Sequence, residues 1–153
     1  MANPVPEGFS TITAHITVKN ATEAIEFYKN AFGAEEICRM PGPGGMIMHA
    51  ELRIGNSPLM LNDEFPDMGK RAPADGTPVT IHLYVNDCDA LFDRAVKAGA
   101  EPLMPPQDTF WGDRYGQVRD PSGHHWGIAT HKEDLTPEQI MANAEKAFSG
   151  GSC

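Results

Sequence analysis

The sequence repeats one arrangement of residues in its two halves. The stretch TAHITV, which starts at Thr13, has a counterpart in TIHLYV, which starts at Thr80, and at the same offset of 67 residues His15 aligns with His82. In both halves the stretch leads into a segment with helical spacing, followed by FGAE in one half and AGAE in the other. A repeat of this length is too long for a solenoid unit, so it predicts a duplicated module of strand, helix and further strands.

The first half divides into elements at residues that break regular structure. Alternating residues predict a strand at 11–18, and apolar residues at helical spacing predict a helix that ends at Gly33, where a left-handed residue is favoured. After the helix, the segment PGPGG separates two strand-like runs, because its residues break both helix and strand. We expect strands at 35–40, 46–54 and 57–63, and a loop with Pro and Gly at 64–78.

The second half follows a similar order and ends in an additional helix. Thr136 as N-cap, Pro137 at the first helical position and Gln139 three residues after the cap predict a helix over 136–148. Before it we expect a strand at 80–85, a helix, a Pro-rich connection EPLMPPQ, a short strand, a loop TFWGDRYGQ, a strand near 117–119, a turn DPSG and a last strand HHWGIAT.

The composition is that of one ordinary globular domain, residues 1–153. With 41% hydrophobic residues the chain is long enough to bury a core. A formal net charge of -9 lacks the basic footprint of a nucleic-acid-binding protein. No segment has the apolar length of a membrane span, no leader is recognisable, and three scattered cysteines form no CxxC pair. We therefore expect a cytoplasmic protein with no nucleic-acid and no membrane partner.

Both repeated strands carry polar side chains on one face. In the first strand Thr13 and His15 share a parity, and in the second strand the same parity carries Thr80, His82 and Tyr84. The opposite parity is apolar in both strands and must face the core. Side chains of medium size that donate and accept hydrogen bonds suit a cavity better than open solvent. A single histidine on a sheet is more often structural or exposed, but the repeat-equivalent pair favours a shared pocket.

The segment FWGDRYG, residues 110–116, gathers aromatic side chains between glycines. We interpret it as a wall or lid of the pocket, with Trp111 and Tyr115 stacking on a flat ligand and Arg114 available to an anionic group. The alternative is an ordinary loop that Trp111 anchors in the core. The segment GPGG at 42–45 precedes a strand-like run rather than a helix, so it is more typical of a hairpin turn than of a phosphate loop.

Longer segments resemble a known family. ITVKNATEAIEFYKNAFGAEE, RYGQVRDPSGHHWGIAT and the duplicated layout are similar to the vicinal oxygen chelate superfamily, which includes glyoxalase I, bleomycin-resistance proteins and extradiol dioxygenases. MHAELRIG, LNDEFPDMG, FWGDRYG and HKEDLTPEQI resemble its PhnB-like branch. The resemblance covers about Phe9 to Ala142. It implies an α+β fold with two βαβββ modules in tandem, at about 9–65 and 78–131, whose curved mixed sheets surround a cleft, and a homodimer.

The resemblance also raises the question of a divalent metal ion. The ligand positions of glyoxalase-type members fall here on Thr13, Glu51, Thr80 and Gly127, of which only Glu51 is a usable ligand. The standard glyoxalase I site is therefore not intact. A displaced set on the same parity remains open, and Zn²⁺ would suit it if the side chains converged. The candidates for that set are Glu51, His49, His15 and His82.

Two classes of function remain open. The first is an enzyme of lyase, isomerase or dioxygenase type that acts on a small oxygenated molecule, with Glu51 and His49 as catalytic residues. The second is a binding or resistance protein that sequesters a small molecule in the same cleft without chemistry. In either class we expect the ligand to contact the residues of the polar faces and of the aromatic segment, namely Thr13, His15, Thr80, His82, Tyr84, Trp111, Arg114 and Tyr115.

Overall fold

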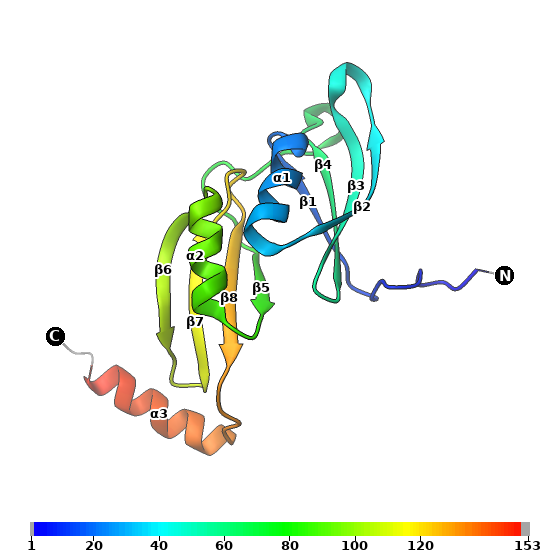
Figure 1. Cartoon of the computed structure of the whole chain (residues 1–153). Helices are drawn as coiled ribbons and strands as arrows, with labels where there is room; N and C mark the ends of the chain where they lie inside the picture. Colours follow the sequence, from blue (N-terminus) through cyan, green and yellow to red (C-terminus); the bar gives the residue numbers. More distant parts are fainter. Residues whose placement is uncertain (1, 151–153) are drawn as a thin grey trace.

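The computed structural model describes residues 2–150 and contains two successive modules of the same design (Figure 1). The first comprises β1 (Ala14–Val18), α1 (Ala21–Phe32), β2 (Glu35–Pro41), β3 (Ile47–Ile54) and β4 (Ser57–Asp63). The second comprises β5 (Thr80–Tyr84), α2 (Cys88–Ala98), β6 (Glu101–Asp108), β7 (Asp113–Arg119) and β8 (His125–His131), and α3 (Pro137–Gly150) follows. The predicted α+β fold of two tandem βαβββ modules with a C-terminal helix is confirmed.

Each module forms one mixed four-stranded sheet with the same strand order. The orders are β1-β4-β3-β2 and β5-β8-β7-β6, and in each sheet the first strand pairs in parallel with the last one of its module. The apolar parity of each sheet faces its helix, where Ile16, Leu52, Leu61, Val118 and Ile128 belong to one buried cluster. The polar parity is left on the opposite face of each sheet.

The ends of α1 follow the sequence signals. The Asn20 side chain accepts a hydrogen bond from the Glu23 backbone N–H, and Gly33 has φ 69°, which places it in the left-handed region expected at a helix end. The last helix also has the predicted capping box. The Thr136 hydroxyl accepts from the Gln139 N–H at 3.2 Å, and the Gln139 side chain accepts from the Thr136 N–H at 2.9 Å.

The second sheet differs from the prediction at its outer edge. The connection EPLMPPQ is itself strand β6, and most of the predicted loop TFWGDRYGQ is strand β7, so only the turn between them is irregular. Prolines fit β6 because it is an edge strand with two register shifts. The N–H groups that prolines lack are therefore not needed for pairing with β7. Gly116 allows the close pairing, because a Cβ there would lie 3.0 Å from the Met104 carbonyl oxygen.

Helices and polar bonds join the two modules. Helix α1 packs against α2, and the Arg94 guanidinium on α2 donates to the Asn30 carbonyl at the end of α1 at 2.7 Å. The Tyr28 hydroxyl donates to buried Asp120, which also accepts from the Trp126 indole at 2.8 Å. These contacts fix the first module against the segment between β7 and β8 of the second.

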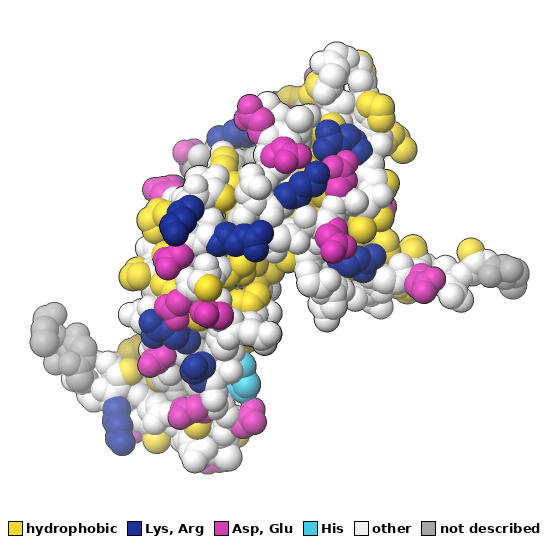
Figure 2. Space-filling model, viewed as in Figure 1, with side chains coloured by type: hydrophobic (Ala, Val, Ile, Leu, Met, Phe, Trp, Pro, Cys, Tyr) yellow, Lys and Arg dark blue, Asp and Glu magenta, His cyan; other side chains and the backbone are white. Residues whose placement is uncertain are grey.

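Helix α3 extends beyond the second sheet, and the N-terminal arm extends from the first (Figure 1). The ring of Phe148 on α3 meets the ring of Phe110 at 5.6 Å between centroids, and the Asn143 amide donates to the Phe110 carbonyl. Acidic and basic side chains alternate over the face that carries α1 and α2 (Figure 2). Among residues 2–150, no helix combines the length and apolar character needed to cross a membrane.

Candidate functional site

A cluster of imidazole, amide and carboxylate groups lies on the polar face of the first sheet. The His15 Nε2 atom is 2.9 Å from Asn62 Oδ1, and His49 Nε2 is 3.2 Å from Glu51 Oε1. The His15 and His49 rings meet edge to face at 5.6 Å. Strands β1, β4 and β3 are neighbours in the sheet, so residues of one parity on these strands become adjacent.

The hydrogen bonds of Asn62 determine how His15 is protonated. The Asn62 amide nitrogen donates to Thr17 Oγ1 and to the Asp63 carbonyl, so its oxygen is the atom that faces His15. His15 must therefore donate from Nε2, and its Nδ1 is the accepting atom of the neutral ring. Burial lowers the pKa of His15 by more than the hydrogen bond to Asn62 raises it, and the positive charge of Lys70 also lowers it. At neutral pH the ring is uncharged.

Aromatic rings line the polar face of the second sheet. The His82 ring lies 4.6 Å from the Tyr84 ring and stacks on Tyr115 at 5.4 Å and 16° between planes, and Trp111 is 6.1 Å from Tyr115. Gly127 lies on the central strand beneath them, and a Cβ there would be 2.8 Å from His82 Nδ1 and 2.9 Å from Tyr115 Cε1. The absence of a side chain at this position therefore permits the stacking. We call His82, Tyr84, Trp111 and Tyr115 the aromatic row.

Buried Asp113 connects the aromatic row to the end of β8. It accepts from the Tyr84 hydroxyl at 3.0 Å and from the Trp111 indole at 3.1 Å, and its other oxygen is 2.9 Å from His131 Nδ1. Burial raises the pKa of Asp113, but these hydrogen bonds outweigh burial and the pKa lies below its usual value. The carboxylates of Asp134 and Asp113 raise the pKa of His131. Asp113 thus orients the outer edge of the row.

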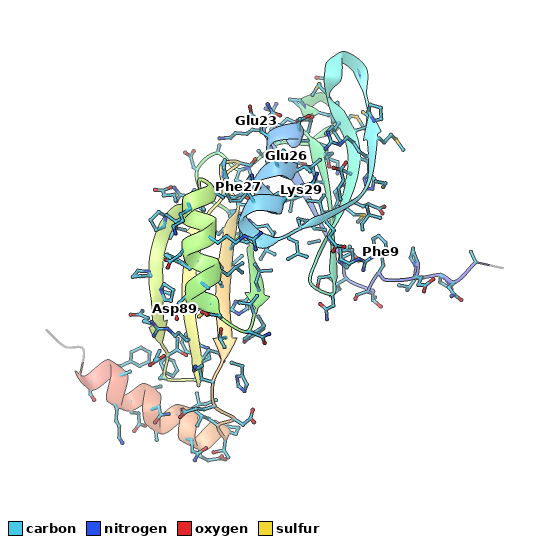
Figure 3. The ribbon with its side chains drawn as sticks, viewed as in Figure 1. Phe9, Glu23, Glu26, Phe27, Lys29 and Asp89 are labelled. Carbon is cyan, nitrogen blue, oxygen red and sulfur yellow. The ribbon has the colours of Figure 1, made fainter. Side chains whose placement is uncertain are left out.

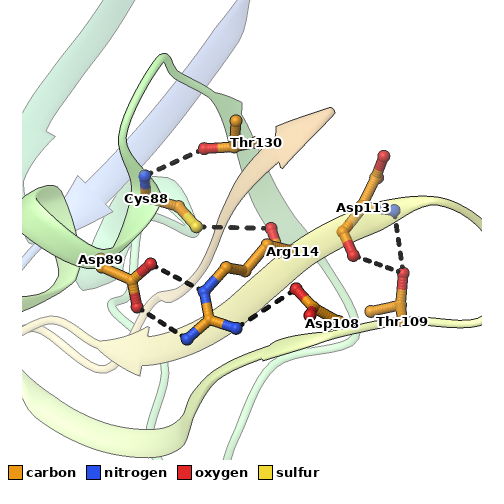
Figure 4. Close-up of polar contacts among 7 residues, drawn as sticks. All are labelled: Cys88, Asp89, Asp108, Thr109, Asp113, Arg114 and Thr130. Carbon is orange, nitrogen blue, oxygen red and sulfur yellow. Dashed lines mark hydrogen bonds and ion pairs between the residues drawn. The ribbon is translucent and has the colours of Figure 1, made fainter. Parts of the chain in front are cut away.

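Arg114 does not face the aromatic row, contrary to the sequence-based prediction. Its parity on β7 is opposite to that of Tyr115, so its side chain lies on the helix side of the sheet. There the guanidinium donates to both oxygens of Asp89, at 2.7 and 3.1 Å, and to Asp108 at 3.2 Å (Figure 4). Because two carboxylates already occupy it, we leave Arg114 out of the candidate site.

The structure brings the remaining candidates together in two groups rather than one. His15, His49 and Glu51 share the first sheet, and Thr13 borders a cavity with Glu51 beneath the N-terminal arm. The aromatic row occupies the second sheet, and Thr80 is exposed at the start of β5 on the same parity. The side-chain hydrogen bonds and ring contacts of each group stay within its own sheet. The grouping of His82 with the other two imidazoles is therefore absent from the described part of a single chain.

Sequence reasoning overlooked several polar residues on the same two faces. These residues lie on β4, β7 and β8 and face the same side of their sheet as His15 or Tyr115, and they are Asn62, Asp113, Gln117 and His131. Applying the alternation rule to SPLMLND, DRYGQVR and HWGIATH would have found them. The expected loop at 109–117 hid the alternation of β7, because a loop has no defined faces.

The donor set does not fit the metal ion that the resemblance implies. Of the four corresponding positions, Thr13, Thr80 and Gly127 offer no carboxylate, imidazole or thiolate, and the His82 and Tyr115 rings crowd the space beside Gly127. Across residues 2–150, no three His, Cys, Asp or Glu side chains are grouped so that they could hold a metal ion. The chemistry of this site has to be derived from the side chains themselves.

Two tandem βαβββ modules, each with one mixed four-stranded sheet, define the class of fold. A model of the Glyoxalase/Bleomycin resistance protein/Dioxygenase superfamily matches residues 9–128, and the chain belongs to this superfamily. An uncharacterized protein of Mycobacterium bovis is 46% identical over 136 residues, which cover 86% of this chain and 90% of the relative.

Solved structures agree with the assignment of the fold. The crystal structure of TioX from Micromonospora sp. ML1 has a TM-score of 0.64 and 28% sequence identity, and the match covers 80% of this chain and 98% of TioX. A Pseudomonas aeruginosa protein is 26% identical with the same TM-score, over 81% of this chain and 99% of its own. These neighbours are similar along nearly their whole length, including both modules.

Proposed function

We propose that the protein binds a flat, oxygen-bearing small molecule on the aromatic row. The observation that supports this proposal is the stacked His82 and Tyr115 pair on an uncovered sheet face, flanked by Tyr84, which is 64% exposed, and Trp111, which is 38% exposed. Exposed aromatic side chains that are held in place by hydrogen bonds offer planar surface at little entropic cost. The hydroxyl and imidazole groups between them would recognise the oxygens of the ligand.

Titration with 2-naphthol tests this proposal, with saturated decahydro-2-naphthol as the non-planar control. Binding is followed by tryptophan fluorescence, to which Trp111 contributes directly. Tyr115→Ala is expected to weaken 2-naphthol binding about tenfold, because it removes one stacking surface. Phe65→Ala, which truncates an aromatic residue outside the row, should change it less than twofold. Equal affinity for the two alcohols, or an unchanged affinity in Tyr115→Ala, would contradict the proposal.

A second function, proton transfer without a metal ion, is supported by the His49 and Glu51 pair. The two side chains are 3.2 Å apart and about one quarter exposed, so Glu51 can accept a proton from a bound molecule while His49 holds the carboxylate in place. The test is exchange of the α-protons of hydroxyacetone with deuterated water, measured by NMR. Glu51→Gln should slow protein-dependent exchange about a hundredfold or more. Exchange that is equally fast in Glu51→Gln and in the surface control Glu35→Gln would eliminate this function.

We also infer that two copies of the chain form a homodimer in which the polar face of one sheet meets a sheet of the other copy. Within the described residues both faces carry exposed apolar side chains, such as Met40 on the first sheet and Tyr84 on the second. A second copy would supply the opposite wall of a closed cleft. Sedimentation of the full chain at about 10 μM should give a dimer. At this concentration a homodimer whose dissociation constant is well below about 10 μM remains associated. A monomer there would contradict this inference.

We further infer that residues 1–153 act as one domain of the PhnB-like branch in the cytoplasm. One buried cluster joins both modules, which supports a single domain with module limits near 9–65 and 78–131 and a helix over 136–148. The segments MHAELRIG and HKEDLTPEQI support the branch. The free thiol of Cys38 is exposed, which is typical of a reducing compartment.

A further inference from the structure

A cavity lies where the two modules meet, between the edge strands β1 and β5. Its volume is about 430 Å³, within the range of small-molecule sites. The walls come from β1, from the connecting segment at 71–79, from Ile81 on β5 and from His124 before β8. The cavity is separate from the aromatic row, and His15 is the residue that it shares with the cluster on the first sheet.

The charge of this cavity is opposite to that of the protein as a whole. The chain has 21 acidic and 12 basic residues, yet the cavity lining within the described residues contains Arg71 and no Asp or Glu. Arg71 forms no side-chain hydrogen bond and no ion pair within residues 2–150, whereas Arg39, Arg114 and Arg119 all pair with carboxylates. An arginine that lines a cavity without a carboxylate partner is suited to an anion from solution.

Neighbouring groups strengthen this preference. Lys70 precedes Arg71, and its charge reaches His15, since it contributes to the lowered pKa of that imidazole. Glu64, which precedes the connecting segment, accepts from the Ala72 N–H at 3.2 Å, and Asp75 lies within the segment, but neither carboxylate lines the cavity. Arg71 is therefore the permanently charged side chain among the described residues that line the cavity.

One wall of the cavity is apolar. Pro78, Val79 and Ile81 line one side, and Val79 is 63% exposed. Thr77 holds this wall in place, because its hydroxyl accepts from the Val79 N–H at 3.2 Å. An inorganic ion would leave these side chains without a partner, whereas a small organic anion would cover them.

We infer that this cavity binds a small carboxylate with an apolar body, with the carboxylate on Arg71 and the apolar part against Val79 and Ile81. A bidentate contact is open to the planar guanidinium, because it has no competing partner among residues 2–150. This site is independent of the proposed function, since it uses no side chain of the aromatic row and neither His49 nor Glu51. A ligand there would also touch both modules and the segment that connects them.

The test is a benzoate titration of the full chain, followed by amide chemical shifts. The amides of Thr77, Val79 and Ile81 should move, and Arg71→Ala should weaken binding about tenfold or more, as expected for a lost charge-assisted contact. Arg71→Lys should retain part of the affinity. Lys97→Ala is the matched control, because it removes one positive charge from the exposed surface of α2 and should change the affinity less than twofold.

Three further results separate this site from its alternatives. Benzyl alcohol should move the same amides far less, because it lacks the charge, and inorganic phosphate should bind more weakly than benzoate, because it lacks the apolar body. Tyr115→Ala should leave the benzoate shifts unchanged, even if it abolishes 2-naphthol binding. Equal losses in Arg71→Ala and Lys97→Ala, equal binding of phosphate, or benzoate shifts confined to the aromatic row would each overturn the inference.

Discussion

At the scale of single residues, a missing side chain shapes the second sheet as much as the side chains that are present. Gly127 does not have the positive φ that favours glycine, so its role is spatial rather than conformational. The rings of His82 and Tyr115 meet above its Cα because no Cβ separates them. The family resemblance assigns a metal-ligand position to this glycine, and here the two rings take the space beside it.

Gly127→Ala should therefore disturb the aromatic row. The added Cβ would come within 3.0 Å of both rings, which must separate, and we expect a loss of about 1–3 kcal/mol in the free energy of unfolding, as for other overpacked sites. Urea unfolding measures this loss. In a Tyr115→Ala background the same change should cost much less, because one of the two rings is gone. An equal cost in both backgrounds would show that the ring contact is not the reason.

At the scale of elements, an ion-pair cluster ties α1 to β2. The Glu36 carboxylate on β2 forms ion pairs with Lys29 Nζ on α1, at 3.0 Å, and with Arg39 Nε on its own strand, at 2.8 Å. Figure 3 shows Lys29 and Glu26 on the outside of α1, where Lys29 also reaches Glu26 at 3.3 Å. Hydrogen bonds from Arg39 and Lys29 lower the pKa of Glu36 to about 2.

Glu36→Gln should change how stability depends on pH. A carboxyl group whose pKa falls from 4.5 to about 2 on folding stabilises the fold above pH 4.5, and this contribution is lost as the pH falls toward 2. The wild type should thus exceed Glu36→Gln in urea midpoint at pH 7, and the difference should shrink between pH 4.5 and pH 2. Glu35→Gln is the control on the same strand. A difference that stays constant over this range would contradict the assignment.

Elements were predicted well where local pattern and tertiary structure agree. The helix signals at Gly33 and Thr136 locate the ends of α1 and the start of α3, and β4 has the predicted bounds. The prediction failed at β6 and β7, where prolines and glycines indicated loops. In β6 the prolines are tolerated because an edge strand needs only half of its backbone groups in the ladder, whereas β7 is extended because it pairs with both β6 and β8.

At the scale of the whole molecule, a buried polar contact holds the two modules together. Asp120 in the turn before β8 accepts from the Tyr28 hydroxyl of α1, from the Trp126 indole and from the Ser122 N–H. The His124 imidazole adds a bond to the Thr17 carbonyl at 2.7 Å. These contacts hold the two modules in one relative orientation. They therefore help to fix how the two polar sheet faces are presented to a ligand or a second copy.

Tyr28→Phe should weaken the contact between the two modules without opening a large cavity, because it removes only the hydroxyl that donates to Asp120. The variant removes one donor from a buried carboxylate, and we expect a loss of about 1–3 kcal/mol in the free energy of unfolding. Chemical denaturation checks the value. Tyr84→Phe, which removes the hydroxyl of an exposed tyrosine that also donates to an aspartate, should cost less. A larger cost in Tyr84→Phe would place the stabilising contact at the aromatic row instead.

The sequence by itself determined the duplication, the parity of the polar faces and most strand and helix positions. These follow from spacing along the chain, because side chains alternate in a strand and recur every 3.6 residues in a helix. It also placed His15, His49 and Glu51 in one candidate set by their shared parity, although it added His82 to the same set. Local spacing was sufficient for each of these conclusions.

Only the tertiary structure decided which residues meet across longer distances. It separated His82 from the other two imidazoles, turned Arg114 to the helix side, and brought His82 and Tyr115 together over Gly127. It also placed Arg71 in the lining of a cavity between the modules. Such contacts depend on strand pairing and on the packing of one module against the other, and no spacing within a single segment encodes them.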